Sequence, residues 1–204
     1  MVAKQITPSE LGVELALEGF QLSDDIGAGL GRLYHSDAPR TAAEWVTLLR
    51  DHKRDIDSEP PSIEDLCTTD DGAHAFLGDE REQSYICVLD PLAVPFLTDR
   101  SGTIRSTTPE HGETVEITVG PDGVSYSNPG AVVSVGVADE TDCADCTTIE
   151  ETYKYVCPYI HVFADEAEYE TWAAETDATT TSVPVETGVA LAGALAENLF
   201  GPAS

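Results

Sequence analysis

The strongest constraint on this sequence is its excess of acidic residues. Aspartate and glutamate number 38 against 10 lysines and arginines, which gives a formal net charge of −28 over 204 residues. Leucine, isoleucine, valine and phenylalanine supply 47 residues, a share just above the roughly 20% below which highly charged chains stay disordered. With two tryptophans and seven tyrosines as well, we expect one folded domain with at most a small appendage.

The same charge excludes partners that need a basic surface. Binding nucleic acid by phosphate neutralisation requires lysine and arginine, and so does docking on anionic lipid. The sequence does not start with a basic segment followed by an apolar run, and no stretch reaches the roughly 18 apolar residues of a membrane span. We therefore expect a cytoplasmic protein with no nucleic acid and no membrane as partner.

The acidic residues are spread along the chain rather than gathered in a tail, and lysine occurs only at Lys4, Lys53 and Lys154. A dispersed carboxylate coat suits concentrated salt, where charge repulsion is screened within roughly 3 Å at 1 M. This pattern favours a halophilic, haloarchaeon-like source over an ordinary acidic protein.

Salt should therefore stabilise the fold. We expect the melting temperature to rise from dilute buffer to molar KCl, because counterions screen the repulsion among the carboxylates. Thermal melting across that range checks this, and a flat or falling melting temperature would remove the argument for a halophile.

Residue patterns divide the chain into a helical N-terminal region, 1–80, and a core, 81–204. Capping boxes and prolines mark helix starts, and period-two alternation marks strands. Asp90 is expected to be the N-cap of a helix, and Cys67 is placed on a short helix that starts at Ser62. The expected helices cover 7–19, 41–55, 62–67, 90–95, 165–172 and 184–200; the expected strands cover 84–89, 114–119, 124–127, 131–138 and 155–163; 176–182 is expected to be a linker.

Five cysteines carry most of the chemical information: Cys67, Cys87, Cys143, Cys146 and Cys157. An odd number in a chain of this type favours thiol or metal chemistry over a disulfide framework. Around Cys87 the sequence places a thiol at a strand end and a carboxylate three residues on, at a helix start. A helix N-terminus stabilises a thiolate, and a carboxylate can move its proton. Alone, the pattern favours a buried small side chain beside an ordinary capping aspartate.

The second segment is the predicted strand 155–163. In a strand, residues 157, 159, 161 and 163 share one face, so Cys157 and His161 could line one pocket. For His161 the favoured interpretation is a hydrogen-bonded core histidine.

Together the two segments resemble the organomercurial (alkylmercury) lyase family, MerB. That family has a Cys-x-x-Asp segment followed by an apolar stretch with proline, as residues 87–95 do here. The family then has a second active-site cysteine followed by a stretch with histidine and phenylalanine, and residues 157–164 are similar to it. Residues 111–115 match the glycine turn between the two, and Trp172 matches the tryptophan helix that follows. Thr108 stands where many members have a third cysteine.

The resemblance covers about residues 80–200 and implies an α+β fold. A small helical, winged-helix-like N-terminal region would precede a mixed-sheet core with ββαβ repeats and flanking helices, a core shared with the copper-delivering NosL proteins. The implied activity is cleavage of carbon–mercury bonds by protonolysis. Cys87 and Cys157 would be the two thiolates that bind mercury, and Asp90 would relay the proton to the departing carbon. No cofactor is required, and Hg²⁺ is the bound product.

Two further interpretations remain open. The alternative function is thiol-based binding or delivery of a soft metal (mercury, copper or zinc) on the same scaffold, without lysis. Its ligands would be Cys87 and Cys157, with Cys143 and Cys146 as further members of the metal site, whereas the carboxylate of Asp90 favours the enzyme. For Cys143 and Cys146 four roles stay open: zinc binding, redox chemistry, acceptance of Hg²⁺ from the active site, or no function. A complete four-cysteine zinc site would need Cys67 and Cys157 as the second pair. Mercuric reductase or a low-molecular-weight thiol would accept the metal.

Overall fold

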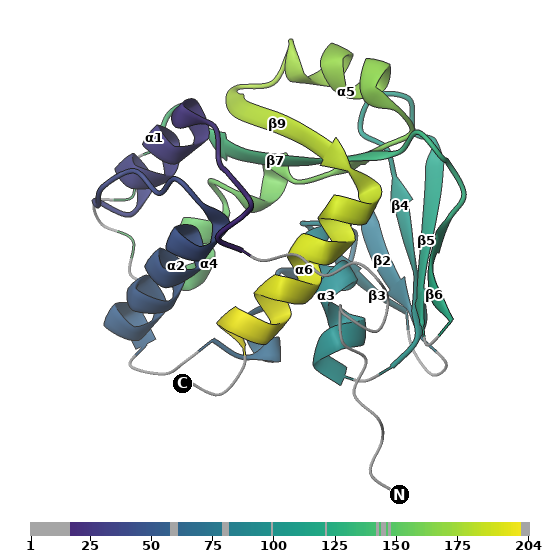
Figure 1. Cartoon of the computed structure of the whole chain (residues 1–204), viewed down its shortest axis with the longest axis horizontal. Helices are drawn as coiled ribbons and strands as arrows, with labels where there is room; N and C mark the ends of the chain where they lie inside the picture. Colours follow the sequence, from purple (N-terminus) through teal and green to yellow (C-terminus); the bar gives the residue numbers. More distant parts are fainter. Residues whose placement is uncertain are drawn as a thin grey trace, which may run out of the picture.

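The computed structural model describes residues 17–57, 61–78, 82–98, 100–120, 122–141, 143, 146 and 148–200. Within them, helices and antiparallel strands form an α+β fold, as expected (Figure 1). The helices are α1 (Asp24–Leu33), α2 (Ala42–Asp57), α3 (Leu89–Thr98), α4 (Ile149–Tyr153), α5 (Glu166–Ala173) and α6 (Val185–Leu199), with 3₁₀ turns η1 (Ile63–Asp65) and η2 (Cys157–Tyr159).

A six-stranded sheet has the order β1-β3-β2-β4-β5-β6. Its strands are β1 (Thr68–Thr69), β2 (His74–Leu77), β3 (Glu82–Tyr85), β4 (Gly102–Thr107), β5 (Thr114–Gly120) and β6 (Gly123–Tyr126). The chain runs β2-β3-α3-β4, which is the ββαβ unit that the resemblance implied. The described pairings are all antiparallel rather than mixed. Both β1 and β2 pair with β3 in this sheet, so the helical part of the N-terminal region ends before Thr68. A domain boundary near residue 80 stays a prediction.

A second sheet has the order β8-β7-β9, with β7 (Val132–Ala138) between β8 (Val162–Phe163) and β9 (Ala178–Pro184). The expected linker 176–182 is therefore wrong: β9 pairs along the whole of β7, and its threonines at 179–181 lie opposite residues 135–137. Threonine is β-branched and fits a half-buried strand well.

Helix α6 lies at the centre of the molecule, with α2 on one side and α3 on the other (Figure 1). Its alanines, leucines and glycines are buried. At Gly188 a Cβ would approach Val133 Cγ2 to 2.7 Å, so the helix can pack this closely on β7 only without a side chain there. This packing places the N-terminus of α3 beside the turns before β1 and at η2.

No helix is expected from the sequence over α1, because the segment is rich in glycine. Ser23 caps it, accepting a hydrogen bond from the Ile26 N–H, and Gly29 lies against Val137 of β7. Tertiary packing thus outweighs the low helix propensity of glycine. The expected helix 7–19 begins outside the described residues, and the winged-helix comparison remains a prediction.

No helix in the described residues is both long and apolar enough to cross a membrane.

Candidate active site

One small cavity of about 70 Å³ gathers the three residues that the sequence singled out. Cys87, Asp90 and Cys157 all line it, and Cys67 joins them. Aromatic and aliphatic side chains make up most of the remaining wall: Tyr34, Trp45, Leu49, Leu66, Leu89, Ala93, Tyr153, Val156, Ile160, Leu195, Leu199 and Phe200. Asp65 completes the lining, so the cavity combines three thiols and two carboxyl groups with mostly apolar walls.

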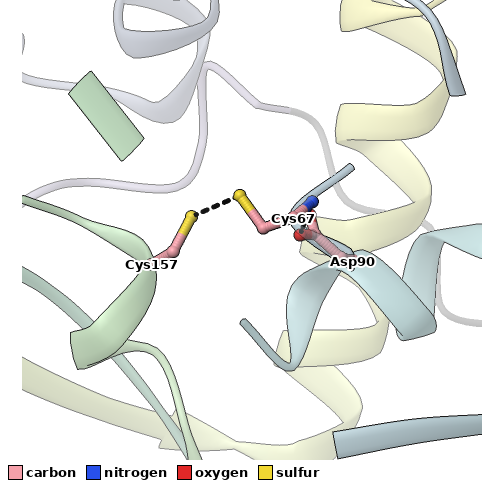
Figure 2. Close-up of side chains that lie close together, drawn as sticks. All are labelled: Cys67, Asp90 and Cys157. Atoms are coloured by element: carbon pink, nitrogen blue, oxygen red, sulfur yellow. Dashed lines mark hydrogen bonds between the residues drawn. The ribbon is translucent and has the colours of Figure 1, made fainter. Parts of the chain in front are cut away.

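The thiols of Cys67 and Cys157 are in direct contact. Their Sγ atoms are 3.2 Å apart, although the residues are 90 positions apart in the sequence (Figure 2). Cys67 lies in the turn between η1 and β1, and Cys157 is the first residue of η2. One ligand atom each from Cys67, Asp90 and Cys157 falls within 4.8 Å of the others, a spacing that suits a single metal ion.

Backbone hydrogen bonds hold these segments together. The Ile86 N–H donates to the Cys67 carbonyl at 3.0 Å, and the Val88 N–H donates to the Ile160 carbonyl at 3.1 Å. The residues on either side of Cys87 are thus bonded to the segments that carry the other two cysteines. The Cys67 N–H in turn donates to Asp90 Oδ2 at 2.8 Å. The site is consequently formed without a ligand.

A buried ion pair fixes the turn before Cys67. Lys53 Nζ of α2 donates to Asp65 Oδ1 at 2.7 Å, and both side chains are largely buried. The other oxygen of Asp65 accepts a hydrogen bond from the Ser62 N–H, which completes a capping box. Because η1 ends at Asp65, Cys67 follows the turn, and the expectation that it lies on a helix is wrong.

Asp90 has an environment that favours its neutral form. Burial raises its pKa to about 6, although hydrogen bonds from Cys67 partly oppose the shift. The expectation that Asp90 is a helix N-cap is also wrong: α3 begins at Leu89, so Asp90 lies in the first turn. Its carboxyl group is free to bond the Cys67 segment instead of the helix end.

The buried thiols likewise favour their protonated forms. Burial raises the pKa of Cys87, and the pKa of Cys157 is raised by hydrogen bonds that its thiol donates to Cys67 and Cys87, together with burial. A soft metal that enters the site must therefore displace thiol protons. Asp90, with a carboxylate oxygen within 4.8 Å of the Cys67 and Cys157 sulfurs, is placed to receive them.

Asp90 should make the stability of the protein pH-dependent in a recognisable way. In the folded protein the pKa of Asp90 is raised above its ordinary value of 3.8. The contribution of Asp90 to stability is therefore complete below pH 3.8 and is lost as the pH rises through about 6. Asparagine cannot ionise, so the Asp90→Asn variant does not lose this contribution. Between pH 4 and pH 7 its free energy of unfolding should rise by roughly 1–3 kcal/mol relative to that of the wild type. Denaturant unfolding of both proteins at each pH measures this difference, and a constant difference would show that Asp90 keeps an ordinary pKa.

Residues 155–163 do not form the expected strand. Cys157 lies on η2, and β8 covers only Val162–Phe163, since Pro158 removes a backbone donor at the second position of the turn. Cys157 and His161 therefore do not share a strand face. His161 is hydrogen-bonded to the Pro158 carbonyl at 2.7 Å and contacts His74 at 3.1 Å. This confirms that His161 is hydrogen-bonded, although its side chain is only half-buried.

Cys143 and Cys146 form a disulfide, and neither lines the cavity. In this oxidised state the pair offers no thiolate to zinc or mercury. The zinc prediction therefore applies only to the reduced chain, and the expectation that these residues belong to one metal site with Cys87 and Cys157 has no support in the oxidised structure. Thr108, matched to a third cysteine of the family, is buried beside Glu113 and also lies outside the cavity.

Cys67 belongs to this site, although the sequence suggested it only, with Cys157, as the second pair of a zinc site. A local signal existed: the capping box at Ser62 and Asp65 closes a short turn just before Cys67. No local pattern could show that this turn meets η2.

The chain matches the family model described as MerB, alkylmercury lyase, over residues 67–197, well over half its length. Among solved structures it is similar to the mercury-bound form of MerB2, with 16% identity and a TM-score of 0.47 over 62% of this chain. The chain spans 59% of the length of that structure. Curated proteins give no match.

Proposed function

Since the chain belongs to the alkylmercury lyase family, we propose that it cleaves the carbon–mercury bond of small organomercurials. The products are a hydrocarbon and Hg²⁺ bound to the protein. The observation that carries this proposal is the convergence of Cys87, Asp90 and Cys157 on one largely apolar cavity.

Two thiols supply what the metal requires. Mercury is a soft ion, and thiolates are its preferred protein ligands. Cys87 and Cys157 bind the mercury of R–Hg⁺ and lose their protons, and the second sulfur weakens the bond between mercury and carbon. The balanced reaction is R–Hg⁺ plus two thiols giving R–H, one Hg²⁺ held by two thiolates, and one H⁺.

Asp90 moves the proton between sulfur and carbon. Its pKa of about 6 lets it accept a thiol proton and return it near neutral pH, the range in which a general acid–base group is most effective. It lies in the first turn of α3, two residues after Val88, whose N–H donates to the carbonyl of Ile160 at the end of η2. The carboxyl group is therefore held next to the sulfurs that release the proton.

The apolar wall accounts for the organic part of the substrate. Trp45, Leu49, Ala93 and Leu195 line the cavity from three different helices. They can hold a small organic group by burial of apolar surface. They also keep water from the sulfurs, so that the proton reaches carbon from Asp90 rather than from solvent.

The acceptor and the location follow from the same chemistry. Mercury bound by thiolates leaves by exchange onto another thiol, so a low-molecular-weight thiol or a mercuric reductase would take the product onward. Such a reducing supply of thiols is a cytoplasmic condition.

A turnover assay tests the proposal against simple metal binding. The protein is incubated with phenylmercury and excess low-molecular-weight thiol, and benzene is measured over time. We expect many equivalents of benzene per protein, well above the thiol-only reaction. A protein that delivers soft metals without lysis would bind phenylmercury and release no benzene above that control.

A further inference from the structure

The cavity contains one more thiol than the proposed reaction uses. Cys67 Sγ lies 3.2 Å from Cys157 Sγ (Figure 2), and Cys157 is also hydrogen-bonded to Cys87. Cys157 thus stands between two other sulfurs. All three cysteines are free thiols in this structure.

Cys67 differs from the other two in its exposure. Cys87 and Cys157 are buried, whereas Cys67 is partly exposed. Cys67 and Cys157 also line a second cavity of about 280 Å³, which is more polar and includes Glu64, Glu150 and Lys154 in its wall. The contact between Cys67 and Cys157 therefore separates the apolar cavity from a more polar one, and an ion in the polar cavity meets Cys67 on its way to Cys87.

The position of Cys67 is fixed by the fold. Its carbonyl accepts from the Ile86 N–H, its own N–H donates to Asp90, and the next residue, Thr68, pairs with Tyr85 in the sheet. Because hydrogen bonds already fix the backbone at Cys67, this residue loses little conformational entropy when its side chain binds an ion. Its place beside Cys157 is thus built into the site.

We propose that Cys67 is a third sulfur ligand, so that the site holds Hg²⁺ through Cys67, Cys87 and Cys157 together. This rests on the proposed function only for the choice of mercury as the metal. Three sulfurs around one soft ion extend a two-thiolate site in the direction that mercury prefers.

Charge and protons balance if Asp90 takes part. Hg²⁺ plus three thiols and the Asp90 carboxylate gives an Hg(SR)₃⁻ centre, a neutral Asp90 and two H⁺. A neutral Asp90 avoids placing two negative charges side by side in a buried site, where their repulsion is strong. In the lytic reaction, R–Hg⁺ plus three thiols gives R–H, Hg(SR)₃⁻ and two H⁺. The thiol proton of Cys67 then replaces the one that Asp90 gave to carbon.

Sulfur ligands are counted directly by X-ray absorption at the mercury edge. Reduced protein receives one equivalent of inorganic Hg²⁺, and Cys67→Ser is compared with the wild type. We expect three sulfurs at a longer Hg–S distance in the wild type, and two sulfurs at a shorter distance in Cys67→Ser. In competition with glutathione, Cys67→Ser should hold Hg²⁺ at least about tenfold less tightly, since even groups that only support a ligand contribute 10- to 100-fold.

The matched control is the double variant Cys143→Ser/Cys146→Ser, which removes two thiols outside the cavity and should keep three sulfurs on mercury. Circular dichroism and Cys67→Ala guard against a folding defect or an oxygen ligand from the new serine. Two sulfurs in the wild type, or three in Cys67→Ala, would overturn the proposal.

Benzene release from phenylmercury, measured on the same samples, separates the two proposals. Three sulfurs without benzene would end the proposed function and leave the third ligand standing. Benzene with only two sulfurs would do the reverse.

Discussion

Replacing Asp90 with asparagine should lower the rate of carbon–mercury cleavage by about 10²- to 10⁴-fold, the usual contribution of a general acid–base group. The affinity for Hg²⁺ should change little, because it resides in the sulfurs. Asparagine keeps an oxygen that can accept the Cys67 N–H, so the geometry of the turn should survive. Benzene release and Hg²⁺ competition with glutathione measure the two quantities on one protein.

The matched control is Asp165→Asn. Asp165 caps α5 and bonds the Glu168 N–H, away from the cavity, and asparagine is an equally good cap. This variant should cleave at the wild-type rate. If Asp90→Asn also cleaves at that rate, Asp90 is not the proton relay.

Replacing Cys87 with serine should abolish cleavage, with a loss of roughly 1,000-fold or more, because residues that act as one catalytic unit are each nearly indispensable. Unlike the Asp90 variant, this one should also bind Hg²⁺ more weakly, since a soft ligand is lost. Cys157→Ser should behave in the same way. Single-turnover benzene release is the measurement.

The double variant Cys143→Ser/Cys146→Ser serves as the control, because its residues lie outside the cavity. It should cleave normally once folded. Retention of full activity by Cys87→Ser would assign the chemistry to other thiols, and equal losses in the control would point to a general effect of cysteine removal.

Local patterns predicted the elements whose signals are contained within one segment. Trp45, Val46 and Leu49 place a buried face on α2, and Asp165 caps α5 as expected. The alternating residues of β5 and the turn before Gly123 also predicted a hairpin correctly. In each case propensity, capping and burial favour the same element, so the tertiary contacts agree with the local preference.

The failures occur where a distant segment decides the structure. The threonines of β9 become a strand because β7 offers an unpaired edge, and the glycines of α1 become a helix because Val137 requires close approach. The candidate site contains one feature that local sequence predicts and one that it does not. The spacing of Cys87 and Asp90 was readable, whereas the contact of Cys67 with Cys157 depends on two turns that only the fold brings together.

The central claim is that the thiols and Asp90 transfer a proton to carbon and keep the metal. Its most direct test is a single turnover of phenylmercury by the reduced protein in D₂O, followed by mass spectrometry of both products. The account predicts one benzene carrying one deuterium per protein, and a protein mass increased by mercury without the phenyl group. A protein that retains intact phenylmercury and releases no benzene would contradict it.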